Sequence, residues 1–457
     1  MRFQTVHTPT SLTEGPISQA LISFALPLLL GNLFQQLYNT ADSLIVGNFL
    51  GSEALAAVSS SGNLIFLMVG LVNGVSMGAG VVIARYFGAK DYDRMQKTIH
   101  TLLAFGLVAG VLLTVVGVAL SPVMLRLMDT PETVLPNSIS YFRTYFTGSL
   151  AFVLYNICMG ILQAVGDSRH PLQYLIISSL VNVVLDLLFV GVFHMGVWSA
   201  AAATAISQLV SMALCLLRLM RSERAYRVSL RKIRFDRRAL LEILQNGLPA
   251  GLQSVMYSLS NIIIQASVNG FGTDVMAAYT AYGKVDGMYW MVINAFGVAI
   301  TTFVGQNFGA RLYDRMKKSI NVCLGIAAAV TLLLSGVLMV VAEPLLGLFS
   351  DDAQVLEIGL SIVRLIVPTY ITYIFIEILS GAMRGAGDSL IPTIMTLTGV
   401  CLLRVFWVTV VVSAHHELNV LLLSYPITWI VTSGMFMVYY LRGRWLKRCI
   451  ALQNAEN

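Results

Sequence analysis

The chain has 457 residues, of which 57% are hydrophobic and only 11% are charged, and its formal net charge is +6 at pH 7. Soluble domains carry roughly 25% charged residues, so this composition excludes an ordinary water-soluble fold. The length suffices for about a dozen membrane-spanning helices of roughly 20 residues each, joined by short loops.

The apolar runs along the chain predict an all-α polytopic membrane protein with twelve transmembrane helices. The first helix runs from about Ile17 to Gly47. Pro27 is expected to bend it, because proline removes a backbone donor and clashes with the preceding turn. The other helices are expected to begin near Ala54, Thr98, Ser138, Leu172, Val197, Leu240, Val275, Ser319, Ile358, Ile391 and Leu418.

Two sequence patterns occur twice, 221 residues apart. Gly88-Ala-Lys-Asp-Tyr-Asp-Arg-Met95 returns as Gly309-Ala-Arg-Leu-Tyr-Asp-Arg-Met316, and Gly166-Asp-Ser168 returns as Gly387-Asp-Ser389. A duplication in so apolar a chain predicts a transporter whose two pseudo-symmetric six-helix lobes rock around a central site.

A basic stretch from Arg218 to Arg238 lies at the midpoint, between the two copies. We expect this stretch to rest on anionic lipid headgroups rather than on nucleic acid. Pro27 and Pro249 pair near the start of each copy, one residue off the register of the repeat. The expected organisation is an amino-terminal segment, an N-lobe with helices 1–6, a basic linker, a C-lobe with helices 7–12 and a carboxyl-terminal tail, over residues 1–16, 17–220, 221–238, 239–441 and 442–457.

The distribution of basic residues predicts the orientation. With the amino terminus placed in the cytoplasm, 24 of the 29 Lys and Arg residues fall in cytoplasmic segments, while the outer loops hold mostly acids. The positive-inside rule therefore predicts a multi-pass protein of the plasma membrane with both termini in the cytoplasm. Because each half has an even number of helices and begins on the same side, the repeats are expected to be parallel.

Four polar residues of the first six helices are expected at one depth. Asp42 and Asp186 each lie about five residues before an outer helix end, and Asn182 lies one turn before Asp186 on the same face. Thr204 lies about seven residues into the sixth helix, which starts at that outer turn. Two carboxylates, an amide and a hydroxyl suit a proton relay or a dehydrated Na⁺ ion, since hard cations prefer oxygen ligands. In the alternative interpretation, each residue forms a separate hydrogen bond between helices.

The second half does not repeat this polar set. The positions that align with Asp42, Asn182, Asp186 and Thr204 hold Ile264, Leu403, Trp407 and Tyr425. A set confined to one lobe favours ion coupling over simple packing.

Weaker candidates for a substrate cavity lie in both halves. Gln35, Tyr38 and Asn39 form a polar stripe on the first helix, either facing a cavity or packing. Lys284 in the eighth helix either pairs locally with Asp286 or contacts substrate. Another weak candidate is the isolated acid of the tenth helix, Glu377.

Small residues and missing motifs complete the sequence features. Gly70, Gly74 and Gly78, spaced by four, indicate a close helix contact. There is no phosphate-binding loop, catalytic triad or zinc motif, and the five cysteines have no metal or disulfide spacing. We therefore expect neither an enzyme nor a bound cofactor, apart from a coupling ion, H⁺ or Na⁺.

The chain resembles the multidrug and toxic compound extrusion (MATE) family over nearly its whole length, from about Gly15 to Arg444. The segments that carry the resemblance are Pro27 to Gly47, Tyr86 to Lys90, Gln163 to Asp167 and Val304 to Ala310. The resemblance implies two six-helix lobes that form a V around a central cavity.

The residue pattern is similar to the DinF-like branch of that family. This resemblance implies that Asp42, Asn182, Asp186 and Thr204 bind the coupling cation and that Pro27 is a conformational hinge. The NorM-like branch carries a Glu in the seventh helix, where this chain has Gln253, Met256 and Tyr257. That difference argues against a Na⁺ site in the C-lobe.

The expected function is secondary active multidrug efflux by an antiporter. A monomer in the lipid bilayer would export small organic compounds, often cationic and amphiphilic, in exchange for inward H⁺ or Na⁺. One alternative is a lipid-linked oligosaccharide flippase of the same superfamily, for which a more cationic cavity and often extra helices are expected. Another is an ion channel, which would show conductance rather than gradient-coupled turnover.

Overall fold

The structure is a computed structural model that describes residues 12–127 and 130–456. These residues form helices and their connections, with no β-strand in either range. The predicted all-α class is therefore confirmed. Residues 1–11 of the expected amino-terminal segment lie outside the described part of the chain.

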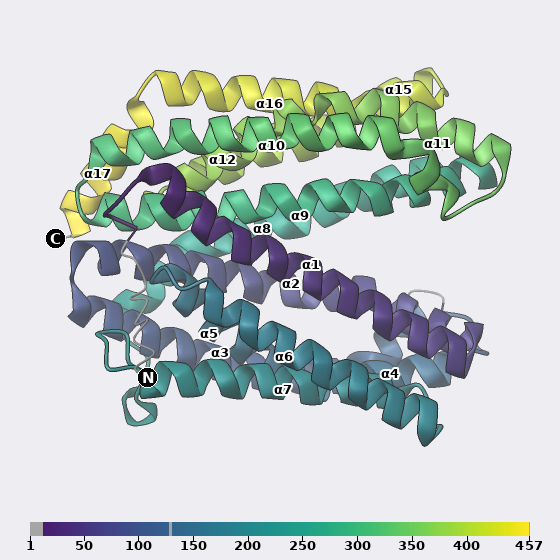
Figure 1. Cartoon of the computed structure of the whole chain (residues 1–457), viewed down its shortest axis with the longest axis horizontal. Helices are drawn as coiled ribbons and strands as arrows, with labels where there is room; N and C mark the ends of the chain where they lie inside the picture. Colours follow the sequence, from purple (N-terminus) through teal and green to yellow (C-terminus); the bar gives the residue numbers. More distant parts are fainter. Residues whose placement is uncertain (1–11, 128–129, 457) are drawn as a thin grey trace, which may run out of the picture. The chain divides into compact units, whose positions relative to one another are not determined.

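Contacts divide the described chain into two compact units. Unit 1 contains Leu26–Gly251, whereas unit 2 contains Leu12–Ala25 and the residues from Leu252 onward. Two helices run through both units, α1 (Ile17–Leu50) and α8 (Arg237–Asn269). The elements between them, all in unit 1, are α2 (Ser52–Ala89), α3 (Tyr92–Leu127), α4 (Leu135–Thr147), α5 (Ser149–Ala164), α6 (Arg169–Asp186), η1 (Leu187–Val192), α7 (Trp198–Arg221) and η2 (Leu230–Lys232); Figure 1 labels the α-helices among them.

Unit 2 continues with a second set of helices. Three short stretches within it are π-helical or 3₁₀ rather than α-helical, as η1 and η2 are in unit 1. The elements are α9 (Thr273–Gly309), α10 (Tyr313–Gly347), α11 (Ala353–Ile366), η3 (Val367–Thr369), α12 (Tyr370–Gly385), α13 (Leu390–Thr396), η4 (Leu397–Leu402), α14 (Leu403–Phe406), η5 (Trp407–Val412), α15 (Leu418–Leu422), α16 (Ser424–Leu441) and α17 (Arg444–Glu456).

All twelve predicted helix positions carry helices. Nine spans within the described residues are long and apolar enough to cross a membrane, and the pair α4–α5, bent by 47°, makes a tenth. The other two expected positions are taken by α2, with 38 residues, and α8, with 33. The predicted twelve-helix fold agrees with this arrangement. The carboxyl-terminal tail adds one further helix, α17.

The duplication is visible in the backbone of the turns. Positive φ angles recur 221 residues apart, in pairs formed by Gly51 and Gly272, Lys90 and Arg311, and Gly166 and Gly387. After the last of these glycines, an aspartate caps the next helix: the Asp167 carboxylate accepts a hydrogen bond from the His170 backbone N–H at 3.2 Å. Asp388 caps its helix in the same way, also at 3.2 Å. The repeated Gly-Asp-Ser motif thus encodes one turn used twice.

The compact units do not divide where the repeats do. Residues 17–25 of α1 belong to unit 2, and residues 237–251 of α8 belong to unit 1. Both boundaries lie within a few residues of a proline inside the helix, Pro27 in α1 and Pro249 in α8. In unit 2, the segment before α1 is held by Gln306, whose Oε1 accepts a hydrogen bond from the Leu12 backbone N–H at 3.1 Å. The boundaries of the N-lobe and the C-lobe that the sequence repeat predicts are not tested by this division and stay a prediction.

The first half of α8 contacts α2 in unit 1 through glycines. A Cβ atom added to Gly78 would lie 2.3 Å from the backbone N of Gly247, and one added to Gly74 would lie 2.3 Å from Cα of Gly251. A Cβ atom at Gly70 would meet nothing within 4 Å. The predicted close contact is therefore confirmed for two of the three glycines.

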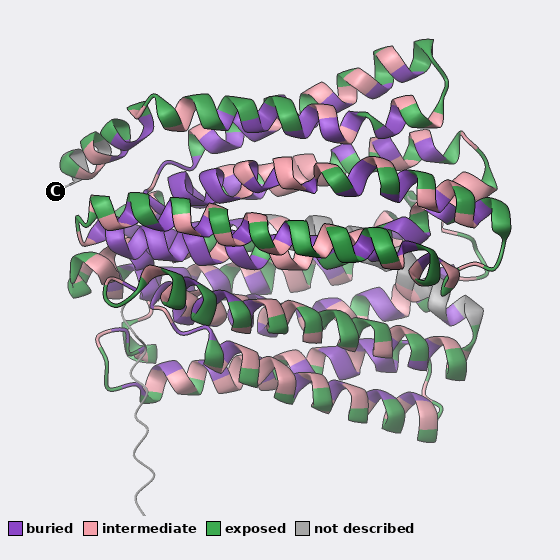
Figure 2. Ribbon diagram, turned by 45° about the horizontal axis from the view of Figure 1, so that its top comes forward, coloured by how far each residue is buried: buried purple, intermediate pink, exposed green. Residues whose placement is uncertain are grey.

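Many exposed side chains of the described residues are apolar. Figure 2 shows exposed and buried residues alternating along the helices, and the most exposed large hydrophobic residues include Leu112 in α3 at 60% and Val340 in α10 at 82%. Within unit 1, α5 packs against both α3 and α7 and supplies much of a buried apolar cluster. Apolar surfaces around closed helix bundles suit a lipid environment.

Candidate functional site

The two acids predicted in the N-lobe lie together in unit 1. Asp42 on α1 is 8% exposed, and Asp186, the last residue of α6, is fully buried. Their carboxyl groups are close enough to interact electrostatically. The sequence placed these residues at one depth, and the structure brings them together.

The amide and the hydroxyl of the predicted set are also buried in unit 1. Asn182 lies one turn before Asp186 on α6 and is fully buried, while Thr204 is 7% exposed on α7, which packs against α6. Several polar atoms here have no hydrogen-bond partner among the described residues, namely Oδ1 of Asp42, both Oδ atoms of Asp186, and Oδ1 and Nδ2 of Asn182. Buried polar atoms without partners are rare in folded proteins, so this concentration marks a site for an exchangeable species.

The donor set of this site determines what it can bind. Two neighbouring carboxylates that are both ionised in a low-dielectric interior are costly, unless a proton or a cation lies between them. Carboxylate and amide oxygens suit H⁺ or Na⁺. In the part of the chain that the structure describes, no group of three or more His, Cys, Asp or Glu side chains could hold a metal ion.

Aromatic and amide side chains surround the acids, and the sequence analysis missed most of them. Tyr38 on α1 lies near Gln208 and Asp42, and Tyr141 on α4 is buried close enough to Asp42 to interact with it electrostatically. Gln208 could have been found, because it lies one helical turn after Thr204 on the same face of α7. Tyr141 carries no comparable signal, since its helix is recognised only as an apolar run.

The weaker candidates on α1 occupy different environments. Gln35 and Asn39 are exposed within the described residues, whereas Tyr38 is half-buried beside the acids. Only Tyr38 of this predicted stripe therefore has a described contact with the acidic site. A cavity role for Gln35 and Asn39 stays a prediction.

The acid next to candidate Lys284, Asp286, belongs to an aromatic cluster in unit 2. Asp286 on α9 accepts hydrogen bonds from Tyr282 at 3.0 Å, from Trp290 at 2.7 Å and from Tyr370. Lys284 is exposed on the same helix. Asp286 is thus satisfied by aromatic donors rather than by the local charge pair that we considered.

Glu377 on α12 has a cationic partner that the sequence did not reveal. Its carboxylate lies 3.5 Å from the guanidinium of Arg384. A Cβ atom added to Gly297 would lie only 2.1 Å from Oε1 of Glu377. Within the described residues, this acid is therefore part of an ion pair that depends on a glycine of α9. Its predicted contact with substrate is untested.

Taken together, a duplicated twelve-helix fold with apolar surfaces and a buried acidic pair defines a multi-pass membrane transporter. The MatE family model matches residues 27–188 and again residues 249–410. The chain therefore belongs to the MatE family, the multidrug and toxic compound extrusion transporters. Each match begins at one of the paired prolines, Pro27 or Pro249, which confirms the duplication.

Similar proteins support this assignment across the whole chain. The probable multidrug resistance protein YoeA of Bacillus subtilis (strain 168) is 30% identical over 437 residues, which cover 94% of each chain. An outward-facing multidrug resistance MATE family transporter of the MOP superfamily matches with a TM-score of 0.89 at 23% identity, covering 98% of this chain and 99% of its own. A MOP superfamily transporter from Pyrococcus furiosus has a TM-score of 0.89 at 24% identity, covering 97% and 98%. These relatives are transporters and not enzymes.

Proposed function

We propose that this protein is a secondary active antiporter of the plasma membrane that exports organic, often cationic and amphiphilic, compounds in exchange for inward H⁺ or Na⁺. The names of relatives such as YoeA and the multidrug export protein MepA of Staphylococcus aureus support a drug-like substrate class. The basic residues of the inner segments support cytoplasmic termini. A monomer is sufficient, because the family fold contains both lobes in one chain.

The observation that carries the coupling proposal is the buried pair Asp42 and Asp186, with Asn182 beside it. Polar atoms of all three residues lack partners among the described protein groups. A transported ion can drive a conformational change only if it binds the two states with different affinity. Binding of a proton or Na⁺ removes the repulsion between two buried carboxylates, so a state in which the two acids lie close together binds the ion more tightly than a state in which they lie apart. This pattern resembles the one expected for the DinF-like branch.

Transport driven by separately imposed gradients tests the proposal. In proteoliposomes that contain the purified protein, we expect a fluorescent organic cation to move against its own gradient when either a pH or a Na⁺ gradient is imposed. The gradient that drives transport identifies the coupling ion. Gradient-independent conductance of small ions would instead indicate a channel. Movement of a labelled lipid-linked oligosaccharide, with none of the organic cation, would indicate a flippase.

Replacement of the α1 proline is expected to slow transport. Pro27→Ala restores the amide donor that proline lacks, so the helix gains a hydrogen bond to the carbonyl of Ser23 and becomes harder to bend. We expect a roughly tenfold lower rate of efflux with normal folding, which corresponds to about 1.4 kcal/mol in the barrier. Initial rates in the same proteoliposomes measure this effect.

A matched control is available in α3. Pro122 also lies inside a helix and is half-buried, but it lies far from either unit boundary. Pro122→Ala should leave the rate within about twofold of the original, because it changes no helix that both units share. Equal slowing by both substitutions would contradict the assignment of Pro27 as a hinge.

A further inference from the structure

The basic linker between the two copies is a fixed part of unit 1. We call its residues 222–236 the linker strap. Gln96, near the start of α3, donates hydrogen bonds from Nε2 to the backbone carbonyls of Ala225 and Arg227, the second at 3.0 Å. Buried side chains of the strap, Tyr226 and Val228, are each only 2% exposed. The strap is thus attached to α3 through both polar and apolar contacts.

The same face of α3 holds the strap at two further places. His100, one turn after Gln96, accepts a hydrogen bond at Nε2 from the Ser229 backbone N–H at 3.1 Å. Its Nδ1 therefore carries the proton and donates to the Gln96 carbonyl at 2.8 Å. Thr101 accepts a hydrogen bond from the Asp236 backbone N–H at 3.1 Å. The equivalent positions in the second copy hold different residues, namely Lys317, Asn321 and Val322.

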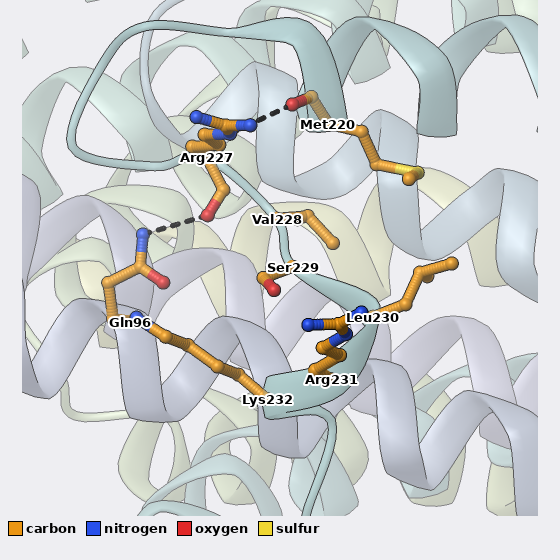
Figure 3. Close-up of a pocket in the computed structure, with 8 residues that line it drawn as sticks. All are labelled: Gln96, Met220, Arg227, Val228, Ser229, Leu230, Arg231 and Lys232. Carbon is orange, nitrogen blue, oxygen red and sulfur yellow. Dashed lines mark hydrogen bonds between the residues drawn. The ribbon is translucent and has the colours of Figure 1, made fainter.

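The attached strap forms one side of a pocket of about 600 Å³. Figure 3 shows its lining, with Arg227 beside Met220 on one side and the Lys232 side chain running toward Gln96 on the other. Arg231 is the third cation of the pocket, and no acidic side chain lines it. None of these three cations forms an ion pair with the residues that the structure describes. The pocket therefore carries uncompensated positive charge.

The position of the pocket along the helices places it at the membrane surface. Gln96 lies in the second turn of α3 and Met220 in the last turn of α7, and both helices are long and apolar enough to span a membrane. The ends of such spans lie at the level of the lipid headgroups. Two large apolar side chains of the strap, Leu230 and Phe235, are 52% and 50% exposed. Apolar side chains beside a basic surface are typical of segments that rest in the headgroup region.

We propose that this pocket binds the phosphate group of an anionic phospholipid headgroup. Arg227, Arg231 and Lys232 supply the charge, and guanidinium groups can hold phosphate oxygens through paired hydrogen bonds. Leu230 and Phe235 favour a lipid over a free phosphate, because a soluble anion gives exposed apolar side chains no partner. In the proposed orientation the lipid belongs to the cytoplasmic leaflet. The linker strap, which connects the two sequence repeats, would thus be bound to a membrane lipid.

Lipid titration of the detergent-solubilised full-length protein tests this proposal independently of transport. The probes are short-chain phosphatidylglycerol, short-chain phosphatidylcholine and inorganic phosphate, with binding followed by native mass spectrometry and by thermal shift. The pocket variant is Arg227→Gln/Arg231→Gln/Lys232→Gln. The matched control, Arg221→Gln/Arg224→Gln/Arg237→Gln, removes three exposed cations at or next to the strap but outside the pocket.

We expect the pocket variant to bind phosphatidylglycerol at least about tenfold more weakly, because each cation near anionic lipid contributes to the attraction. The affinity of the control variant for phosphatidylglycerol should change by no more than about twofold, because salt screens the charges that lie outside the pocket. The single substitution Arg231→Gln, which alters only an exposed side chain, gives a graded loss should the triple variant fail to fold. Equal losses in both triple variants, or equal binding of phosphatidylcholine, would overturn the proposal. The proposal would also be overturned if inorganic phosphate bound as tightly as phosphatidylglycerol and the pocket variant lost that phosphate binding.

Discussion

Asp42→Asn is expected to abolish gradient-driven efflux while the protein still folds. Asparagine keeps the size of the side chain but cannot release a proton or contribute a negative charge to a cation. With Asp186 alone, the site no longer has the paired carboxylates whose repulsion an incoming ion relieves. We expect the initial rate of gradient-driven transport to fall about a hundredfold or more, equivalent to about 2.7 kcal/mol. Efflux of a fluorescent organic cation from proteoliposomes measures it.

Two further variants make this test specific. Asp274→Asn removes an acid at the start of α9, outside the site, and should leave the rate unchanged. Asp42→Asn/Asp186→Asn should be no worse than either single variant, because residues that act as a unit are not additive. Undiminished gradient-driven export by Asp42→Asn would disprove the coupling role of the pair.

Gly78→Ala is expected to destabilise unit 1. The added methyl group would lie 2.3 Å from the backbone N of Gly247, and backbone atoms cannot move aside as a flexible side chain can. Overpacking of this kind typically costs about 1–3 kcal/mol, against a gain of roughly 0.5–1 kcal/mol from replacing glycine inside a helix. The fraction of monodisperse protein that remains after heating in detergent should therefore decrease.

Gly70→Ala provides the control for this prediction. It makes the same chemical change in the same helix, but the new Cβ atom would meet nothing within 4 Å. This variant should be as stable as the original or slightly more stable. If Gly78→Ala were to survive heating as well as Gly70→Ala, the close contact of α2 with α8 would not contribute to stability.

Features with a local signal in the sequence were predicted well. The helices follow from apolar runs, and the repeated motifs correspond to turns whose positive φ angles recur 221 residues apart. The pairing of Asp42 with Asp186 was inferred from depth alone, since helix geometry converts residue number into height in the membrane. The helices and turns need only the chain near the residues concerned, whereas the pairing of the two acids needs only the depth of each residue in its own helix.

Features that depend on distant residues were not predictable. Asp286 accepts a hydrogen bond from Tyr370, 84 residues away in the sequence, and no sequence periodicity indicates such a contact. The attachment of the linker strap is another such case. Nothing in a basic stretch indicates that Gln96, 129 residues earlier in the sequence, will donate hydrogen bonds to it. The division of α1 and α8 between the units is a third case. A continuous apolar helix looks the same whichever unit its two ends pack with.

The sharing of α1 between units has a consequence for how the protein is made. Leu12, which precedes α1, is bound by Gln306, a separation of 294 residues. During synthesis, residues 12–25 are therefore made long before the helix that contacts Leu12, α9. Unit 1 in turn stays incomplete until residues 237–251 emerge from the ribosome. Each repeat thus needs residues of the other to complete its packing, and the contacts of residues 12–25 with unit 2 form only after part of the second repeat has been synthesised.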